Sequence, residues 1–356
     1  MPQETYTYVR GFTFIQSTTP TSPEYLDTWY NTDTKLVKIY GCSGWESFAT
    51  FEPGVCNNYG YSMGGYNNVS FSIIDRIEFP FDSGTATHVG NLSGIRSRNI
   101  GCNSSNYGYS MGGISNNYTS IIDRIEFPFD SGTASHVGNL GGTKEWSAGC
   151  NCSNYGFYMG GYDGSYRLST IDHITFPFDS GTASHVGNLS GTRYTSAGYN
   201  SSNYGFCIDG MDGTNSRLST IDRITFPFDS GTASHVGNLS ETKDSSAGCN
   251  SSNYGYCMGG HSGSNNFSTI DRIIFPFDSG TASHVGNLSG LKWGSAGCNS
   301  SNYGFCMGGH SGSDLSTVDR IIFPFDSGTA SHVGNLSGAR YYCAGCDGTD
   351  FVSLFS

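Results

Sequence analysis

The sequence has little charge, and its basic residues are few and scattered. Asp, Glu, Lys and Arg make up 13% of 356 residues, and the 17 Lys and Arg leave a formal net charge of −12. Nucleic-acid binding needs a basic surface to meet the phosphates, so we expect no nucleic-acid partner.

Long apolar segments are also missing. No run of about 18 apolar residues occurs, so no membrane-spanning helix is predicted. The start, MPQETYTYVRGF, lacks the apolar region of a signal peptide, and we therefore expect synthesis in the cytoplasm without one.

Glycine and aromatic residues are abundant instead. The chain has 51 Gly, 23 Tyr and 23 Phe, together with many Ser and Asn. The aromatic rings can bury much apolar area, which argues against disorder. This composition is typical of short strands joined by tight turns.

One phrase, close to IDRITFPFDSGTASHVGNLS, recurs six times. The first Phe of its FPFD stands at positions 79, 127, 176, 226, 275 and 323. Each unit contains four segments with strand character, and in the fourth unit Ile224, Phe226 and Phe228 alternate onto one side. Four strands repeated at this period predict an all-β fold, a β-propeller of four-stranded blades.

The number of blades stays open at this stage. Six complete units run from about 50 to 338, and residues 339–356 repeat a first strand. That strand could complete a seventh blade with residues 34–50 as its outer hairpin. It could instead pair with the first blade in a ring of six.

The repeats resemble those of the kelch family of β-propellers. The family's Gly-Gly doublet appears as MGG in five units and as IDG, with Asp209, in the fourth. The resemblance covers roughly residues 45–346 and implies a kelch-like propeller. A propeller fold alone does not specify a function.

Residues 1–50 differ from the repeats and are expected to form a small β segment before a propeller domain of residues 51–356. The stretch LDTWYNTDTKLVKIYGCSGW (26–45) resembles a short module of bacteriophage tail-fibre and other structural proteins. The repeats also resemble propeller repeats of marine tailed phages. The two resemblances imply a virion protein that is attached to other virion proteins through its N-terminal segment, and oligomeric in the particle.

Two repeated residue types are interpreted as structural: a His in all six units and an Arg in five. The histidines occupy the position where kelch repeats place a packing Trp, so the resemblance implies that they pack between blades. Symmetry keeps equivalent residues of different blades far apart, which argues against a shared metal site. The Arg of DRI, replaced by His173 in the third unit, predicts an Asp/Arg network between blades. The repeated histidines are His88, His136, His185, His235, His284 and His332.

Most of the 12 cysteines fall at two positions of the repeat. Cys249 and Cys257 could face each other across a hairpin, as could Cys298 and Cys306. Other units have Tyr199 or Ser110 there, so the fold does not require a bond. We expect free, buried cysteines.

Differences between the copies concentrate in two connections. The turns between strands 1 and 2 (CNSSN) and between strands 3 and 4 (DSGTAS) hardly vary, whereas the 2–3 and 4–1 connections do. In an antiparallel four-stranded blade these variable connections emerge on the same face. We expect that face to bind a ligand, with aromatic rings suited to sugar rings and several sites adding by multivalency. The candidate residues are Tyr66, Arg98, Lys144, Trp146, Tyr162, Tyr166, Arg193, Tyr194, Arg217, Lys292, Trp293, Tyr341 and Tyr342.

These observations predict a binding protein rather than an enzyme. No catalytic set stands apart from the repeat, and no cofactor or metal is expected. The first hypothesis is a phage tail fibre or adhesin, located in the virion, that binds a host-surface polysaccharide or receptor. The alternatives are a capsid or tail component that binds only other virion proteins, and a cellular kelch scaffold.

Overall fold

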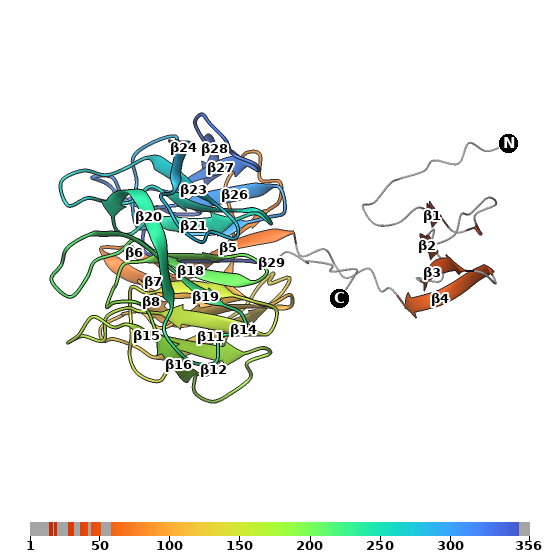
Figure 1. Ribbon diagram of the computed structural model, residues 1–356, viewed down its shortest axis with the longest axis horizontal. Coiled ribbons are helices and arrows are strands. Elements are labelled where there is room, and N and C mark those ends of the chain that lie inside the picture. Colours follow the sequence, from red (N-terminus) through yellow and green to blue (C-terminus); the bar gives the residue numbers. More distant parts are fainter. Residues whose placement is uncertain are drawn as a thin grey trace. The chain divides into compact units, whose positions relative to one another are not determined.

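The repeats form six antiparallel sheets arranged around one axis (Figure 1). The computed structural model describes residues 14–16, 18–19, 28–31, 36–41, 44–50 and 58–348. The chain divides into two compact units, and the larger one, Asn58–Thr349, is the propeller. Its described residues are all strand, turn and loop, and no helix there could span a membrane.

Each blade has four strands, ordered here from the axis outward. Blade 1 holds β29 (Ala344–Gly348), β5 (Tyr59–Met63), β7 (Val69–Glu78) and β8 (Thr87–Arg96), with the short β6 (Tyr66–Asn67) beside β7. Blade 2 holds β9 (Ile100–Asn103), β10 (Tyr107–Met111), β11 (Ile121–Glu126) and β12 (Ser135–Asn139). Blade 3 holds β13 (Ala148–Asn151), β14 (Tyr155–Met159), β15 (Thr170–Thr175) and β16 (Ser184–Asn188).

The other three blades repeat this order. Blade 4 holds β17 (Ala197–Asn200), β18 (Tyr204–Ile208), β19 (Leu218–Thr225) and β20 (Ser234–Lys243). Blade 5 holds β21 (Ala247–Asn250), β22 (Tyr254–Met258), β23 (Thr269–Ile274) and β24 (Ser283–Asn287). Blade 6 holds β25 (Ala296–Asn299), β26 (Tyr303–Met307), β27 (Thr317–Ile322) and β28 (Ser331–Asn335).

Ring closure occurs within blade 1, so the propeller has six blades and not seven. The C-terminal strand β29 pairs antiparallel with β5, with Ala344 opposite Met63 and Gly348 opposite Tyr59. The N-terminal strands take no part in it. They form a separate sheet, in the order β1 (Phe14–Gln16), β2 (Thr28–Asn31), β3 (Leu36–Gly41) and β4 (Gly44–Thr50).

Glycine allows the six innermost strands to meet around the axis. A Cβ atom added to Gly297 would lie 2.0 Å from the carbonyl oxygen of Gly248 in the preceding blade. No side chain fits there, which explains why all six innermost strands have Gly at their second position. At the end of these strands, the Asn250 N–H donates to the Asn299 side chain at 3.0 Å. Four similar contacts link the other neighbouring inner strands from Asn103 to Asp347.

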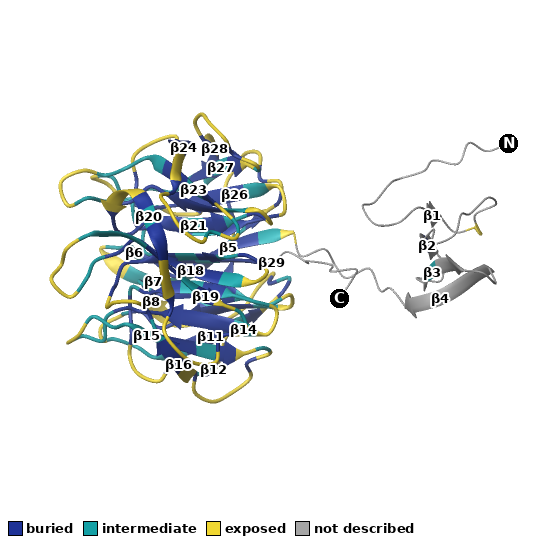
Figure 2. Cartoon of the chain, viewed as in Figure 1, coloured by how far each residue is buried: buried dark blue, intermediate teal, exposed yellow. Residues whose placement is uncertain are grey.

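Aromatic and aliphatic side chains fill the space between neighbouring blades. Ile224, Phe226 and Phe228 lie in one cluster with residues of blade 3, which confirms the alternation predicted for the third strand. Across that interface the Phe157 and Phe226 rings stack at 5.3 Å. Equivalent stacks occur at all six interfaces, including Phe79 on Phe305 at the closure. Figure 2 shows the resulting pattern of buried strands and exposed loops.

A buried ion pair also joins each blade to the next. The Arg340 guanidinium lies 2.9 Å from the Asp75 carboxylate, and both side chains are almost fully buried. The Ser337 N–H and hydroxyl donate to the same carboxylate at 2.8 and 2.7 Å. The other five interfaces have the pairs Arg96–Asp123, Lys144–Asp172, Arg193–Asp222, Lys243–Asp271 and Lys292–Asp319.

The arginines of DRI form a second, outer set of contacts between blades, as predicted. Arg223 pairs with Asp278 of the next blade at 2.5 Å and donates to the Phe277 carbonyl at 3.0 Å. Blade 3 has His173 at this position, which stacks on Tyr155 at 4.7 Å instead. Equivalent pairs join Arg76 to Asp130, Arg124 to Asp179, Arg272 to Asp326 and Arg320 to Asp82.

The repeated histidines do not pack between blades, contrary to the prediction. They lie on the outermost strands with exposed rings, since that strand faces solvent on its outer side. Five of them stand beside the buried aspartate of their own blade; His88 Nδ1 is 3.9 Å from Asp75. His185 comes closest, 3.3 Å from Asp172. At this interface Gly141 stands where the other five have a serine that donates to the buried aspartate. His136 instead contacts the Gly138 carbonyl at 3.0 Å.

The ten described cysteines are free, as expected. Cys249 and Cys257 do not face each other, because they point to opposite sides of blade 5 and lie in different clusters. Burial raises the pKa of the Cys249 thiol well above its usual range and that of Cys257 to about 12. These thiols are therefore core residues rather than nucleophiles.

We predict that the ring depends on the buried ion pair at its closure. Arg340→Met should lower the free energy of unfolding by about 3–5 kcal/mol, because Asp75 is left buried without its counter-charge. Urea unfolding measures the loss. Arg320→Met, at the same interface but paired with an exposed carboxylate, should cost about 1 kcal/mol or less. Equal effects of the two variants would contradict this role.

Candidate ligand-binding face

The two variable connections of each repeat lie together on one face of the propeller, as predicted. In blade 3, Glu145 of the 4–1 connection pairs with Tyr162 of the 2–3 loop, and Tyr162 pairs with Arg167 within that loop. The other blades repeat the first of these pairings, as in Trp293 with His310 and Tyr341 with Tyr66. We call this side the variable face. The nearly constant 1–2 and 3–4 turns form the opposite, invariant face.

Six residues of the 4–1 connections surround the axis on the variable face. All six have left-handed backbone, with φ between 56° and 67°. The N–H of each donates to the carbonyl of its counterpart in the preceding connection at 2.6–3.0 Å, which closes a ring of six peptide hydrogen bonds. These axial residues are Arg98, Trp146, Thr195, Ser245, Gly294 and Tyr342.

The axial position is chemically different in every blade. Going round the ring, three large residues follow one another (Tyr342, Arg98 and Trp146), and then three small ones (Thr195, Ser245 and Gly294). They border a hollow of about 120 Å³ that continues inward to the glycines of the innermost strands. The layer between consists of Asn99, Ser147, Ser196, Ser246, Ser295 and Cys343. Near-identical blades thus enclose an asymmetric opening.

Aromatic rings extend from this opening across the variable face. Trp146 contacts Tyr194 and Tyr342, with ring centroids 5.8 Å apart in both cases. Trp293 contacts Tyr342 at 5.4 Å and Tyr341 at 5.3 Å. We call the connected set the aromatic belt: Tyr118, Tyr162, Tyr194, Trp146, Tyr342, Tyr341, Trp293, Tyr66, His261 and His310.

Two arginines of this face, Arg98 and Arg217, form ion pairs with carboxylates. Arg98 lies over the Trp146 ring at 3.9 Å and pairs with the buried Glu145 carboxylate at 3.2 Å. Burial raises the pKa of Glu145, and the Arg98 charge opposes that rise. The stack and the ion pair together hold the guanidinium at the edge of the hollow, where it keeps free donors.

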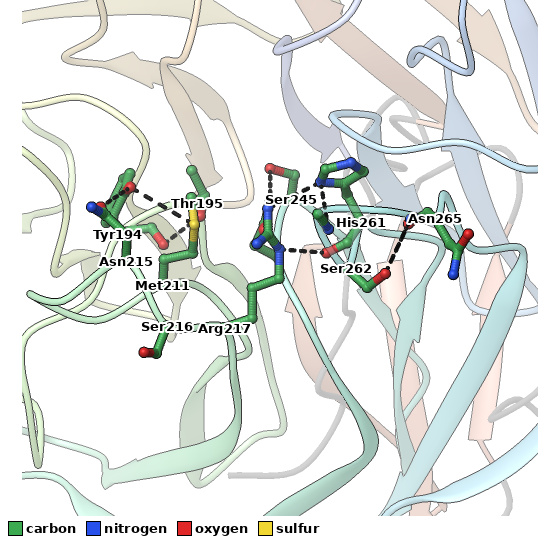
Figure 3. A network of polar contacts seen from close by, with 12 residues as sticks. Tyr194, Thr195, Met211, Asn215, Ser216, Arg217, Ser245, His261, Ser262 and Asn265 are labelled. Atoms are coloured by element: carbon green, nitrogen blue, oxygen red, sulfur yellow. Dashed lines mark hydrogen bonds and ion pairs between the residues drawn. The ribbon is translucent and has the colours of Figure 1, made fainter.

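A polar network joins the loops of blades 4 and 5 (Figure 3). Arg217 pairs with Asp244 at 2.6 Å and donates to the His261 carbonyl at 3.2 Å. Burial lowers the pKa of His261, so its ring is neutral near pH 7 and its Nδ1 can accept from the Arg217 guanidinium at 3.2 Å. In the neighbouring loop Tyr194 donates to Asn215 at 2.9 Å. These contacts fix the loop positions.

Four of the predicted ligand-binding residues are buried: three of them are cations that are wrongly assigned, and the fourth, Tyr194, is only 8% exposed within the aromatic belt. Lys144, Arg193 and Lys292 are buried beneath the face, where each neutralises an aspartate between blades. Their connections vary, but a cation recurs at this position in every blade because every interface needs its counter-charge.

The remaining predicted residues lie on the variable face, in different settings. Trp146, Tyr162, Tyr194, Trp293, Tyr341, Tyr342 and Tyr66 belong to the aromatic belt, Arg98 borders the hollow, and Arg217 lies in the loop network. Tyr166 is 72% exposed and stands apart from the belt at a loop tip.

Sequence reasoning missed several members of the site. Tyr118, His261 and His310 belong to the belt, and Arg167 lies over the Tyr162 and Tyr194 rings at 5.1 Å. Their signal was available, because all four occupy the variable 2–3 loops. Thr195 and Ser245 also lie in variable connections, the 4–1 connections, but only the fold shows that these two positions border the axis.

Asp209 is the other departure from the repeat, at the first glycine of the doublet. Its φ of 54° is left-handed, and its carboxyl is fully buried. One carboxylate oxygen accepts the Ala197 N–H at 3.0 Å, and a contact with the Ser246 hydroxyl also favours the charged form. Burial raises the pKa of Asp209 to about 7, against the opposing charge of Lys243.

Comparison with known proteins supports the fold alone. No protein-family model matches the chain, and its sequence matches no curated protein. Among solved structures the propeller is similar to that of YjhT, with a TM-score of 0.60 over 72% of this chain and 88% of that one. The two sequences are 9% identical in this alignment, so the similarity carries no residue roles.

We predict that Asp209 destabilises the propeller at neutral pH. Because its folded-state pKa lies above the unfolded value of about 3.9, wild-type stability should fall as pH rises from about 4 to 7 and then level off. Asp209→Asn removes this dependence. The free energy of unfolding of the variant, relative to that of wild type, should therefore be higher at pH 8 than at pH 4 by roughly 2–4 kcal/mol. Urea unfolding across this pH range measures the difference. The exposed Asp229→Asn is the control, and a gain independent of pH would contradict the prediction.

Proposed function

We propose that this protein is a binding module whose variable face holds a carbohydrate of a host cell surface. The observation that carries the proposal is the location of sequence differences in a chain of near-identical blades. They gather on one face, around one opening, in a connected set of aromatic rings. Drift without selection would not be expected to assemble rings from separate blades into contact.

The chemistry of the face suits sugars. Aromatic rings offer flat apolar surfaces to the C–H faces of a sugar ring, and Tyr and Trp combine such a surface with a polar group. Between the rings lie hydroxyl groups, backbone carbonyls and the Arg98 guanidinium. Weak contacts to several sugars of one polymer add up when they lie on one rigid disc.

The two ends of the described propeller lie on the side opposite the variable face. The start of β5 pairs with the end of β29, with Tyr59 opposite Gly348, at the end of the strands that carries the invariant 1–2 turns in the other blades. The ends of the propeller therefore leave the variable connections uncovered.

We infer that the anchor is a phage particle and that the module acts as a tail-fibre type adhesin. The support is the resemblance of residues 26–45 to a module of phage structural proteins, and of the repeats to marine tailed-phage propellers. Other virion proteins would then hold the N-terminal segment. If the variable face instead binds a virion protein, the chain is a structural component without adhesive function.

We predict that the aromatic belt is needed for cell binding. Labelled wild-type protein should bind host cells saturably, and the purified surface polysaccharide should compete. Trp146→Ala combined with Trp293→Ala should reduce binding by roughly a hundredfold or more, because both central rings are lost. Flow cytometry with labelled protein measures the effect.

Two controls separate binding from folding. Trp146→Phe with Trp293→Phe keeps the rings and should retain most binding, and Ile274→Ala removes an exposed side chain outside the variable connections. Thermal unfolding checks that each variant is folded. Undiminished binding by a folded double-alanine variant would overturn the proposed site, and saturable binding to other virion proteins only would favour the structural role.

A further inference from the structure

We propose that the axial hollow is a specific subsite for the terminal unit of an uncharged saccharide chain, which enters end-on along the propeller axis. This inference rests on the proposed function and deepens it. The belt supplies general affinity for sugar, whereas the hollow selects one unit.

The shape of the opening is the first argument. Tyr342, Arg98 and Trp146 form a wall on one side, and Thr195, Ser245 and Gly294 leave a notch on the other. The six backbones are equivalent and hydrogen-bonded in a ring, so the asymmetry comes from side chains alone. The side chains therefore break the six-fold symmetry of the backbone, so a ligand in the hollow has one preferred orientation.

The size of the hollow is the second argument. At about 120 Å³ it holds several water molecules but falls below the 300–1,000 Å³ of a site that encloses a whole drug-sized ligand. Glycines of the innermost strands line its inner part. A volume of this size suits the end of a saccharide chain rather than a whole oligomer.

The hydrogen-bonding character of the hollow is the third argument, and it favours a ligand that donates. Thr195 donates its hydroxyl to the Tyr194 carbonyl at 2.6 Å, and Ser245 donates to Asp244 at 2.8 Å. In the layer beneath, Ser147 and Ser295 donate to backbone carbonyls at 3.0 Å. Each of these oxygens keeps lone pairs, so the walls present acceptors for the O–H groups of a sugar.

The charge balance is the fourth argument. Arg98 is paired with Glu145, and Asp244, next to Ser245, is paired with Arg217. An acidic unit would place its carboxylate against hydroxyl acceptors, with only an already neutralised guanidinium to receive it. A neutral sugar needs no counter-charge and can use the free donors of Arg98 as well.

The chain itself offers a substitution that fills the notch without straining the backbone. Tyr342 and Trp146 adopt a φ of 56° at the equivalent axial position, close to the 58° of Thr195. The backbone at Thr195 should therefore accept a Tyr without strain. Thr143→Tyr adds the same ring at an exposed site of another 4–1 connection and is the matched control.

The test measures binding of small sugars directly. The probes are glucose, galactose, mannose and N-acetylglucosamine as neutral sugars and glucuronic acid as an acidic one, titrated against the full chain while tryptophan fluorescence is recorded. We expect saturable binding of at least one neutral sugar, weakened roughly tenfold or more by Thr195→Tyr and unchanged by Thr143→Tyr. Preference for glucuronic acid, no binding of any neutral sugar, or equal binding by both variants would overturn the inference.

A parallel assay with the intact surface polysaccharide separates the two proposals. If Thr195→Tyr binds the polysaccharide as tightly as wild type, while the double-alanine belt variant does not, the axial subsite is wrong and the binding face stands. If wild type binds neither polysaccharide nor cells, the proposed function itself fails.

Discussion

The buried contact between an aspartate of one blade and a cation from the preceding connection is the constraint on which this structure depends. It occurs at all six interfaces, including the closure, where Arg340 reaches Asp75. A carboxylate buried in this way requires its partner, so the cation fixes the path of each 4–1 connection. The next two residues of the connection then pair with the 2–3 loop and enter the axial ring.

This anchoring explains how the face can vary while the fold does not. The axial backbone is held by the ion pair on one side and by the glycine-packed inner strand on the other. Residues as different as Trp146, Gly294 and Arg98 therefore occupy equivalent positions with nearly the same φ. The side chain at the axis can therefore change without loss of the hydrogen-bonded ring.

Much of the fold could be predicted from the sequence because the information is local and repeated. The alternation of Ile224, Phe226 and Phe228 and the fixed turns are enough to place four strands in each unit. Ring closure could not be predicted, since a first strand such as residues 344–348 has the same sequence whether it begins a seventh blade or completes the first. The number of blades is decided by the pairing of β29 with β5, two strands from opposite ends of the propeller sequence.

The position of the variable face was predicted correctly, but the setting of several of its candidate residues was not. Lys144 and Lys292 were misplaced because variability of a connection was taken to mean exposure of all its residues; the cation shared by every blade was the missed signal. The repeated histidines were predicted to be buried between blades but are exposed. Regular recurrence of a residue in the sequence does not show whether its side chain is buried. The role of Thr195 and Ser245 depends on the meeting of different blades at the axis, which no single repeat contains.

Hydrogen–deuterium exchange with the bound surface polysaccharide tests the central claim most directly. The account predicts slower exchange in the variable connections, such as residues 141–147 and 211–219, and no change in the invariant turns, such as residues 229–234. Protection confined to the invariant turns would contradict it, because the ligand would then bind the face from which the chain departs.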